Sequence, residues 1–235
     1  MNDKFRASHL VIRESKPVTG GTQTEWNSET ELKRLRALYQ LLNALTCAHG
    51  LEEVYEAAIT SLLSATEAER AAILMFDDEG VVRFQAWRGL STEYRDATTG
   101  HTPWPKGTRD AQPLIVKDVR SDESLRAYRE VICREGIRAL AFIPLVLGDG
   151  VFGKLMLYYP EPHNCAGDEL AIAQSIAGHV AIATERTRAE LAGAQSERRL
   201  QAILDNSPAV ILLKDRQGKY ELVTRLLSMG RVATR

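Results

Sequence analysis

Two apolar stretches joined by a tight turn constrain the fold of this chain more than any other feature. They lie within residues 136–159, GIRALAFIPLVLGDGVFGKLMLYY, on either side of Gly148-Asp149-Gly150. The glycines supply the positive φ angles that a tight hairpin turn needs. Because both arms are apolar at nearly every position, we expect them to be covered on both faces, as the central strands of a sheet between layers of helices are.

Three further segments are predicted to be strands of the same sheet. Arg70–Phe76 and Val81–Trp87 flank an acidic turn at residues 77–80, which predicts an antiparallel hairpin. Leu114–Val119 predicts a short strand. With the apolar hairpin, these segments favour an α+β fold, an α/β/α sandwich whose antiparallel sheet has about five or six strands and carries helices on both faces.

Helices are predicted before this group of strands. Ser28 and Glu31 form a capping box at the start of a helix that ends at Gly50. A narrow seam of leucines follows the capping box at three- and four-residue spacing: Leu32, Leu35, Leu38, Leu42 and Leu45. A second helix is predicted from about residue 51 to residue 65, and residues 1–27 are expected to be mostly disordered.

The remaining predicted helices are two short ones and one very long one. Ser91 and Ser121 have the character of N-caps, so each should begin a short helix. The long helix should run from about Asp168 to about Leu204, with a seam of small residues along it. Because most globular helices are shorter, we expect part of this helix to project and to bury its seam against a partner chain, in a homodimer formed through the terminal helices.

Composition excludes several classes of partner and compartment. The formal net charge of −1 gives no basic surface for nucleic acid or anionic lipid. Cys47, Cys133 and Cys165 lie far apart in sequence, which favours a reducing compartment over a disulfide framework. No apolar run reaches the roughly 18–20 residues that span a bilayer, and the first residues do not form a signal peptide. We expect a cytoplasmic protein without a membrane partner.

The motif around the apolar hairpin resembles that of a GAF domain, a ligand-sensing module of bacterial signalling proteins. The segment 136–145, GIRALAFIPL, is similar to the family pattern G-I-x-S/A-x-x-x-x-P-L, and Gly153-Lys154-Leu155 is similar to the strand that follows it. The order of predicted elements agrees over roughly residues 32–190. Cys165 is a departure, because an aromatic residue is usual at that position. We expect the GAF domain to occupy residues 28–190.

A second resemblance follows the long helix. Residues 197–209 look like the start of a PAS domain, after a signalling helix or linker at 191–206. Residues 207–235 would then be a truncated PAS segment beginning with a hairpin. Proteins with GAF followed by PAS are commonly sensor histidine kinases or cyclic-di-nucleotide enzymes. The resemblance implies a non-catalytic sensory part of such a protein, and we expect a fragment of a sensor histidine kinase of a two-component system.

The resemblance also implies where a ligand would bind. In GAF domains the pocket lies on one face of the sheet, closed here by about residues 87–118 and by the helix at 125–133. This part of the chain concentrates aromatic side chains, which suit a flat or heterocyclic ligand and could equally fill the core. The candidate ligand-binding residues are Trp87, Tyr94, His101, Trp104, Asp118, Tyr128 and Phe142.

The cofactor stays open at this stage. Bilin attachment would need a cysteine at about Ala127, and haem would need His101 as its axial ligand, so we expect neither group. Asn164, Asp168 and Glu169 only loosely match the cyclic-nucleotide signature of the family, and the two acids suit a helix N-terminus. No metal site is expected.

Two other functions remain as alternatives. The domain could be a structural dimerisation module whose pocket is filled by its own side chains. It could also be an enzyme, because one group with the GAF fold reduces methionine sulfoxide. That chemistry needs closely placed cysteines, and Cys133 and Cys165 do not have a recognisable spacing.

Overall fold

A five-stranded antiparallel sheet forms the centre of the molecule. The computed structural model describes residues 23–148, 150–206, 212–214, 217 and 220–223. The strand order is β2-β1-β5-β4-β3, with every neighbouring pair antiparallel. The strands are β1 (Arg70–Phe76), β2 (Val82–Arg88), β3 (Leu114–Val116), β4 (Ala139–Leu147) and β5 (Gly150–Tyr159). The predicted antiparallel sheet of about five or six strands is confirmed.

The apolar hairpin supplies the middle of this sheet, as its sequence predicts. β5 lies between β1 and β4, and its register pairs Leu155 with both Ile73 and Ile143. These three side chains are 0–1% exposed. The turn has positive φ at Gly148 and Gly150, which is the conformation that the glycines were expected to supply.

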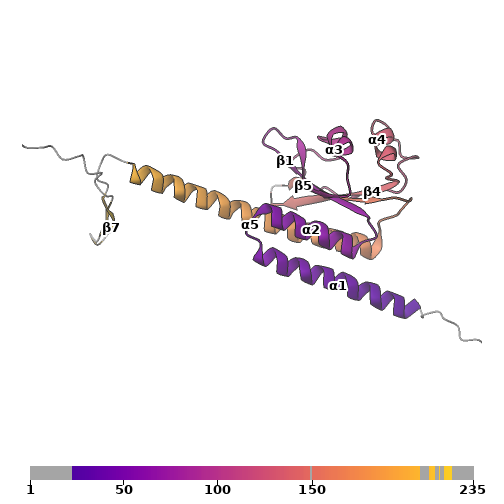
Figure 1. Cartoon of the computed structure of the whole chain (residues 1–235), viewed down its shortest axis with the longest axis horizontal. Coiled ribbons are helices and arrows are strands. Elements are labelled where there is room, and N and C mark those ends of the chain that lie inside the picture. Colours follow the sequence, from indigo (N-terminus) through magenta and orange to yellow (C-terminus); the bar gives the residue numbers. More distant parts are fainter. Residues whose placement is uncertain (1–22, 149, 207–211, 215–216, 218–219, 224–235) are drawn as a thin grey trace, which may run out of the picture.

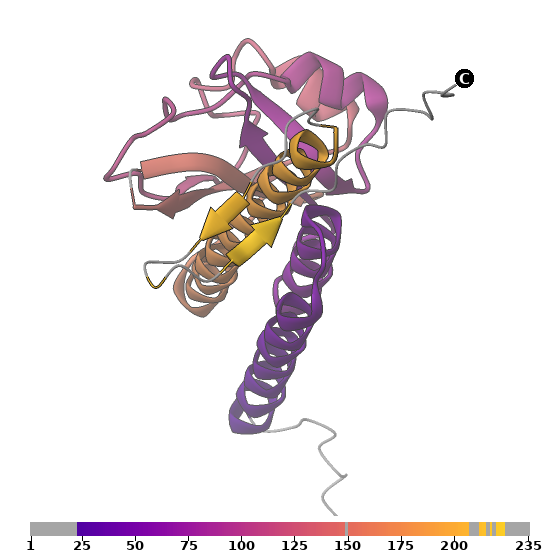
Figure 2. The same ribbon diagram turned by 90° about the vertical axis from the view of Figure 1, so that its left-hand side faces the viewer.

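Three helices cover one face of the sheet. They are α1 (Gln23–Cys47), α2 (Leu51–Ala65) and α5 (Gly167–Asp205). α2 and α5 pack on the strands, whereas α1 lies outside them and packs on α2 and α5 (Figure 1, Figure 2). The core on this face consists of aliphatic side chains of these helices and of alternate strand positions.

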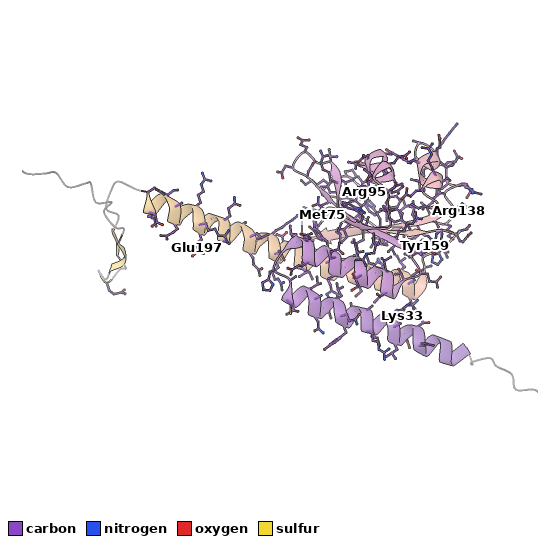
Figure 3. All side chains as sticks on the ribbon, viewed as in Figure 1. Lys33, Met75, Arg95, Arg138, Tyr159 and Glu197 are labelled. Carbon is purple, nitrogen blue, oxygen red and sulfur yellow. The ribbon has the colours of Figure 1, made fainter. Side chains whose placement is uncertain are left out.

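Two short helices and a long connection cover the other face. They are α3 (Thr92–Thr98) and α4 (Arg129–Arg134), which lie on the opposite side of the sheet from α1, α2 and α5 (Figure 1). Side chains fill both layers next to the sheet (Figure 3). A second, separate core forms here, and it contains most of the buried aromatic rings of the described chain. The sandwich of helices, sheet and helices is therefore complete.

Three predicted boundaries were wrong. α1 begins at Gln23 rather than at Ser28, because residues 23–27 contain no glycine or proline that would end a helix. The strand predicted at 114–119 ends at Val116. The helix predicted from Ser121 begins only at Arg129, because side chains take over the backbone groups before it: Asp122 accepts hydrogen bonds from both N and Oγ of Ser124.

The leucine seam of α1 does not face the core as one stripe. Ala37, Leu41 and Leu45 are buried, at i, i+4 and i+8. The predicted seam residues Leu35 and Leu42 are instead 63% and 39% exposed. The reason is that a helix packed on only one side buries a single stripe, so the neighbouring leucines are left on the surface.

The long helix extends well beyond the domain. Every residue from 189 to 203 is exposed, and the side chains around Glu197 project from a bare helix (Figure 3). Beyond it, β6 (Leu212–Lys214) pairs with β7 (Tyr220–Val223), where the first hairpin of a PAS-like segment was predicted (Figure 2). The remainder of that prediction, like the disorder predicted for residues 1–22, lies outside the described residues. None of the described helices has the length and apolar character needed to cross a membrane.

Candidate functional site

A small cavity lies between the sheet and the layer formed by α3, α4 and the connection from residue 99 to residue 113. Its floor is made by side chains of the central strands: Leu74 of β1, Leu140 and Phe142 of β4, and Lys154, Met156 and Tyr158 of β5. These residues lie on one face because side chains alternate along a strand. Water-sized molecules have about 20 Å³ for their centres, which is room for roughly one water.

The roof of the cavity comes from the short helices and the connections around them. It is lined by Tyr94 and Thr98 of α3, by Ile132 of α4, and by His101 and Tyr128 from the irregular segments before α4. The rings of His101 and Tyr128 are 4.4 Å apart between centroids, and both residues are half-buried. Phe84 of β2 also lines the cavity and is half-buried as well, so the lining is partly exposed at these three rings.

Hydrogen bonds fix α3 and α4 relative to each other. The Glu135 carboxylate accepts hydrogen bonds from Ser91 N at 2.7 Å and from Ser91 Oγ at 2.6 Å. Ser91 in turn caps α3 by accepting a bond from Tyr94 N. The Arg134 guanidinium adds a contact to Glu93 at 2.7 Å. The roof is thus braced at the ends of both helices.

Among the described residues that line the cavity, Lys154 has the one buried ammonium group. Its side chain is on β5 and the residue is 3% exposed. Nζ donates a hydrogen bond to the carbonyl oxygen of His101 and lies 5.0 Å from the centroid of the Phe142 ring. Burial lowers the pKa of Lys154 to about 7. Burial, with a smaller effect of Lys154, also lowers the pKa of His101.

The tyrosines of the cavity remain neutral hydroxyl groups. The rings of Tyr94 and Tyr158 meet edge to face, with centroids 5.8 Å apart. Burial raises the pKa of both hydroxyls, so they act only as hydrogen-bonding groups near neutral pH. The described lining therefore combines aromatic and aliphatic surface with hydroxyl groups and one amine.

Four of the seven predicted ligand-binding residues come together at this cavity. Tyr94, His101, Tyr128 and Phe142 all line it, although they come from α3, β4 and the segments between. Trp104 does not line the cavity but packs behind it, edge-on to Phe142 at 6.5 Å, and is 9% exposed.

The other two predicted residues lie elsewhere. Trp87 is on the edge strand β2, is 38% exposed, and is covered by the Arg95 guanidinium at 3.9 Å. Asp118 pairs with Arg138 through hydrogen bonds of 2.9 and 3.3 Å. The bond to Arg138 holds the pKa of the Asp118 carboxyl below its usual range. Neither side chain is placed at the cavity in this structure.

Sequence reasoning missed Lys154 and Tyr158. Both belong to an almost continuous apolar run. Such a run predicts a buried strand but does not by itself show which side chains face the cavity and which face the helices. The alternation of a strand was the available signal, because it puts residues 154, 156 and 158 on one face. Charged residues are rarely buried, so a lysine within a run of buried apolar positions indicates a candidate functional position.

The cysteines and acids of the other proposed chemistries are not gathered at the cavity. Cys133 packs with the core on the cavity side of the sheet, whereas Cys165 is buried in the core on the helical side. Glu169 belongs to the helical side as well, where it accepts bonds from Tyr159 Oη at 3.1 Å and Glu67 N at 2.9 Å. Among the described residues, no cluster of three or more His, Cys, Asp or Glu side chains could hold a metal ion.

Comparison with protein families and solved structures gives one family throughout. The GAF domain model matches residues 50–184, more than half of the chain. A domain of a protein assigned as a two-component sensor histidine kinase, from Sinorhizobium meliloti, is 42% identical. That match covers 61% of this chain and 97% of that structure, with a TM-score of 0.58.

Two more distant structures have the same fold. The GAF domain of a protein assigned as a sensor histidine kinase from Pseudomonas syringae pv. tomato is 18% identical, with a TM-score of 0.55 over 75% of this chain and 99% of that one. The GAF domain of a phosphoenolpyruvate-protein phosphotransferase from Coxiella burnetii is 21% identical, with a TM-score of 0.56 over 68% and 98%. No curated protein sequence matches the chain.

Proposed function

Because the chain belongs to the GAF domain family, we propose that it is the sensory module of a signalling protein, binding a small molecule in the cavity between the sheet and α3–α4. GAF domains are regulatory modules, and relatives of this chain include domains of proteins assigned as sensor histidine kinases. The cavity itself carries the proposal, since it places a buried amine and several aromatic rings around an enclosed space.

The site is suited to a small ligand rather than to a large planar cofactor. Its present volume of about 20 Å³ is far below that of a drug-sized pocket, which is on the order of several hundred Å³. A ligand larger than one or two waters therefore requires His101 or Tyr128 to move. These two half-buried residues belong to irregular segments, which can move without breaking the sheet.

We further propose that the signal leaves through the terminal helices of a homodimer. α1 presents Leu32, Leu35, Tyr39 and Leu42, each 39–68% exposed, and α5 presents Leu191, Leu200 and Ile203, each 50–58% exposed. Exposed apolar stripes on neighbouring helices favour helix pairing with a second chain. Ligand binding would then shift the balance between two packings of these helices.

A structural dimerisation module is the second candidate, and the small volume of the cavity favours it. In that case the tyrosines and Phe142 already fill the space that a ligand would take, and the domain only holds two chains together. The two candidates differ in whether any molecule occupies the cavity.

Native mass spectrometry of the purified protein, compared with its denatured mass, tests the proposed function. A dimer that carries an additional small molecule is the expected result. Two results together contradict the ligand-binding proposal. They are a dimer without additional mass, and NMR signals of the residues lining the cavity that no small molecule shifts. A monomer contradicts the proposed relay through paired helices.

A further inference from the structure

Lys154 is a buried cation without a counter-ion among the described residues. Its only described hydrogen bond goes to the His101 carbonyl, and none of the described ion pairs includes it. An ammonium has more donors than this one bond uses, and burying it without an anion is energetically costly. The remaining donors face the enclosed space that Phe142 and Tyr158 also line.

The charge and the size of the cavity both restrict what could pair with this ammonium. A single cation is balanced by one negative charge, whereas a phosphate dianion would require further cationic groups that the described lining lacks. The rest of the floor is apolar, with Leu74, Leu140 and Met156 around the amine. A ligand that satisfies both features has one anionic group and a short apolar body.

We propose that this cavity binds a small organic monocarboxylate, whose carboxylate replaces the His101 carbonyl as the partner of the Lys154 ammonium. The inference rests on the proposed sensory function and names the chemical class of its ligand. The bond to the His101 carbonyl already has a charged donor, so the exchange gains the negative charge that the buried ammonium lacks among the described residues.

Ligand binding by this route also removes a hydrogen bond that holds the segment above the cavity. Gly100 N bonds to Val82 O at 2.9 Å and Gly107 N bonds to Val151 O at 2.8 Å, which ties the segment to the sheet at two points. Between these points, the bond from Lys154 to His101 is the described hydrogen bond from the segment to the floor of the cavity, and the rings of His101 and Trp104 also contact Phe142. Losing the hydrogen bond leaves these ring contacts to hold residues 101–106 on the floor.

Proton uptake accompanies this binding. The amine loses much of its charge above about pH 7 in the free protein and becomes fully charged beside a carboxylate. The other titratable groups facing it are His101 from the roof and the tyrosines Tyr94, Tyr128 and Tyr158. His101 is mostly neutral at pH 7 because its pKa is lowered. Carboxylate affinity should therefore fall by about tenfold per pH unit above pH 7.

The test compares carboxylates with neutral molecules of the same shape. Propionate and benzoate are titrated into the full chain beside propionamide and benzamide, and binding is followed by amide NMR shifts at residues lining the cavity. We expect each carboxylate to bind at least about tenfold more tightly than its amide near pH 6.5. Lys154→Met should abolish this preference, while Lys106→Met should keep it. Lys106 is the matched control because it also donates to a carbonyl, that of Asp77, but is exposed.

The outcomes separate this inference from the proposed function. Equal affinity for acid and amide overturns the ligand class but leaves a binding cavity in place. A neutral molecule that copurifies while no carboxylate binds has the same meaning. A preference that survives Lys154→Met overturns Lys154 as the partner of the carboxylate, and with it the inference. Absence of any bound molecule, in the titrations and in native mass spectrometry, overturns both. If Lys154→Met does not fold, the pH profile of propionate affinity in the unaltered chain decides the question.

Discussion

Two lysines make the same kind of hydrogen bond in opposite surroundings. Lys154 donates to the His101 carbonyl from a position that is 3% exposed, and Lys106 donates to the Asp77 carbonyl from the surface. Burial lowers the pKa of Lys154 to about 7, because it penalises the charged form of the amine. Lys154 therefore lowers the free energy of unfolding at every pH at which this lysine is protonated in the unfolded chain.

This penalty gives a pH-dependent prediction for stability. The pKa of Lys154 is about 7 in the folded state and 10.5 in its ordinary state, so the unfolded chain binds more protons between these pH values. Below about pH 7 the whole penalty is present, and it disappears as the pH rises through this window. Lys154→Met should raise the free energy of unfolding by on the order of 3 kcal/mol near pH 6.5 and by much less near pH 10.

Urea denaturation at several pH values measures this difference, with Lys106→Met as the control that should change little at any pH. If Lys154→Met were destabilising by the same amount at every pH, the buried amine would carry no penalty of this kind.

Gly153 leads to a second prediction at single-residue scale. A Cβ at this position of β5 would lie 2.6 Å from the Leu74 carbonyl oxygen and would also overlap Met75 Sδ. Because backbone cannot move aside cheaply in a central strand, Gly153→Ala should lower the free energy of unfolding by about 2 kcal/mol or more. Gly178→Ala on α5 meets open space and should raise it by up to about 1 kcal/mol. Thermal unfolding of the two variants measures both, and equal effects would contradict the clash.

For single residues, the sequence predicts which region of the chain forms the cavity better than it predicts the contacts of each side chain. Tyr94 and Tyr128 were found because the few aromatic residues of the chain are concentrated in one region of the sequence. Trp87 and Asp118 share that region but have local partners, Arg95 and Arg138, which compete for their side chains. Such pairings depend on the tertiary structure and leave no pattern in the sequence.

At the scale of single elements, the start of α5 shows how burial separates two neighbouring acids. Asp168 and Glu169 are both in the first turn, where the helix dipole favours negative charge. Asp168 pairs with Arg34 at 3.3 Å with its own side chain 86% exposed. Glu169 is buried and accepts bonds from Glu67 N, Tyr159 Oη and His163 Nε2. Through these bonds, Glu169 joins α5 to the end of β5 and to the connection before β1.

Removing each acid in turn tests this distinction. Glu169→Ala should cost about 2–4 kcal/mol of unfolding free energy, because it leaves the Glu67 amide and the Tyr159 hydroxyl without a buried partner. Asp168→Ala should cost less than about 1 kcal/mol, as exposed ion pairs do. Chemical denaturation of both variants provides the comparison. Similar losses would mean that the dipole, which both acids share, outweighs the buried hydrogen bonds.

Element types follow from the sequence more reliably than their ends. α2 and β1 have the predicted bounds, because each has a regular pattern between clear breaks. The start of α4 was misplaced because Ser121 and Asp122 have the residue types of a helix cap, but use them to close turns. Whether such a residue caps a helix or a turn is decided by what the following residues pack against.

At the scale of the whole molecule, an apolar stripe on α1 is left uncovered. Leu32, Leu35, Tyr39 and Leu42 follow one another at three- and four-residue spacing and are all exposed. The proposed dimer would cover these side chains together with the bare part of α5. The stripe is separate from the core residues Leu41 and Leu45, so its substitution need not disturb the fold.

Charges on this stripe should therefore dissociate the dimer without unfolding the domain. We expect the double variant Leu35→Glu and Leu42→Glu to sediment as a monomer in analytical ultracentrifugation, with a thermal midpoint close to that of the unaltered chain. Lys33→Glu changes the net charge by the same amount on another side of α1 and should leave the dimer intact. A double variant that remains dimeric would place the interface elsewhere.

In the exposed part of α5, the number of residues sets both the length of the helix and the direction in which its end points. A helix advances about 1.5 Å and turns about 100° with each residue. Deleting one residue near Glu197 would therefore turn the end of α5 about 100° around the helix axis while drawing it slightly closer to the sheet. Deleting seven would bring that end about 10 Å nearer with almost its original heading. Between residues 189 and 203, each residue added or removed changes the length of the helix and the orientation of its end together.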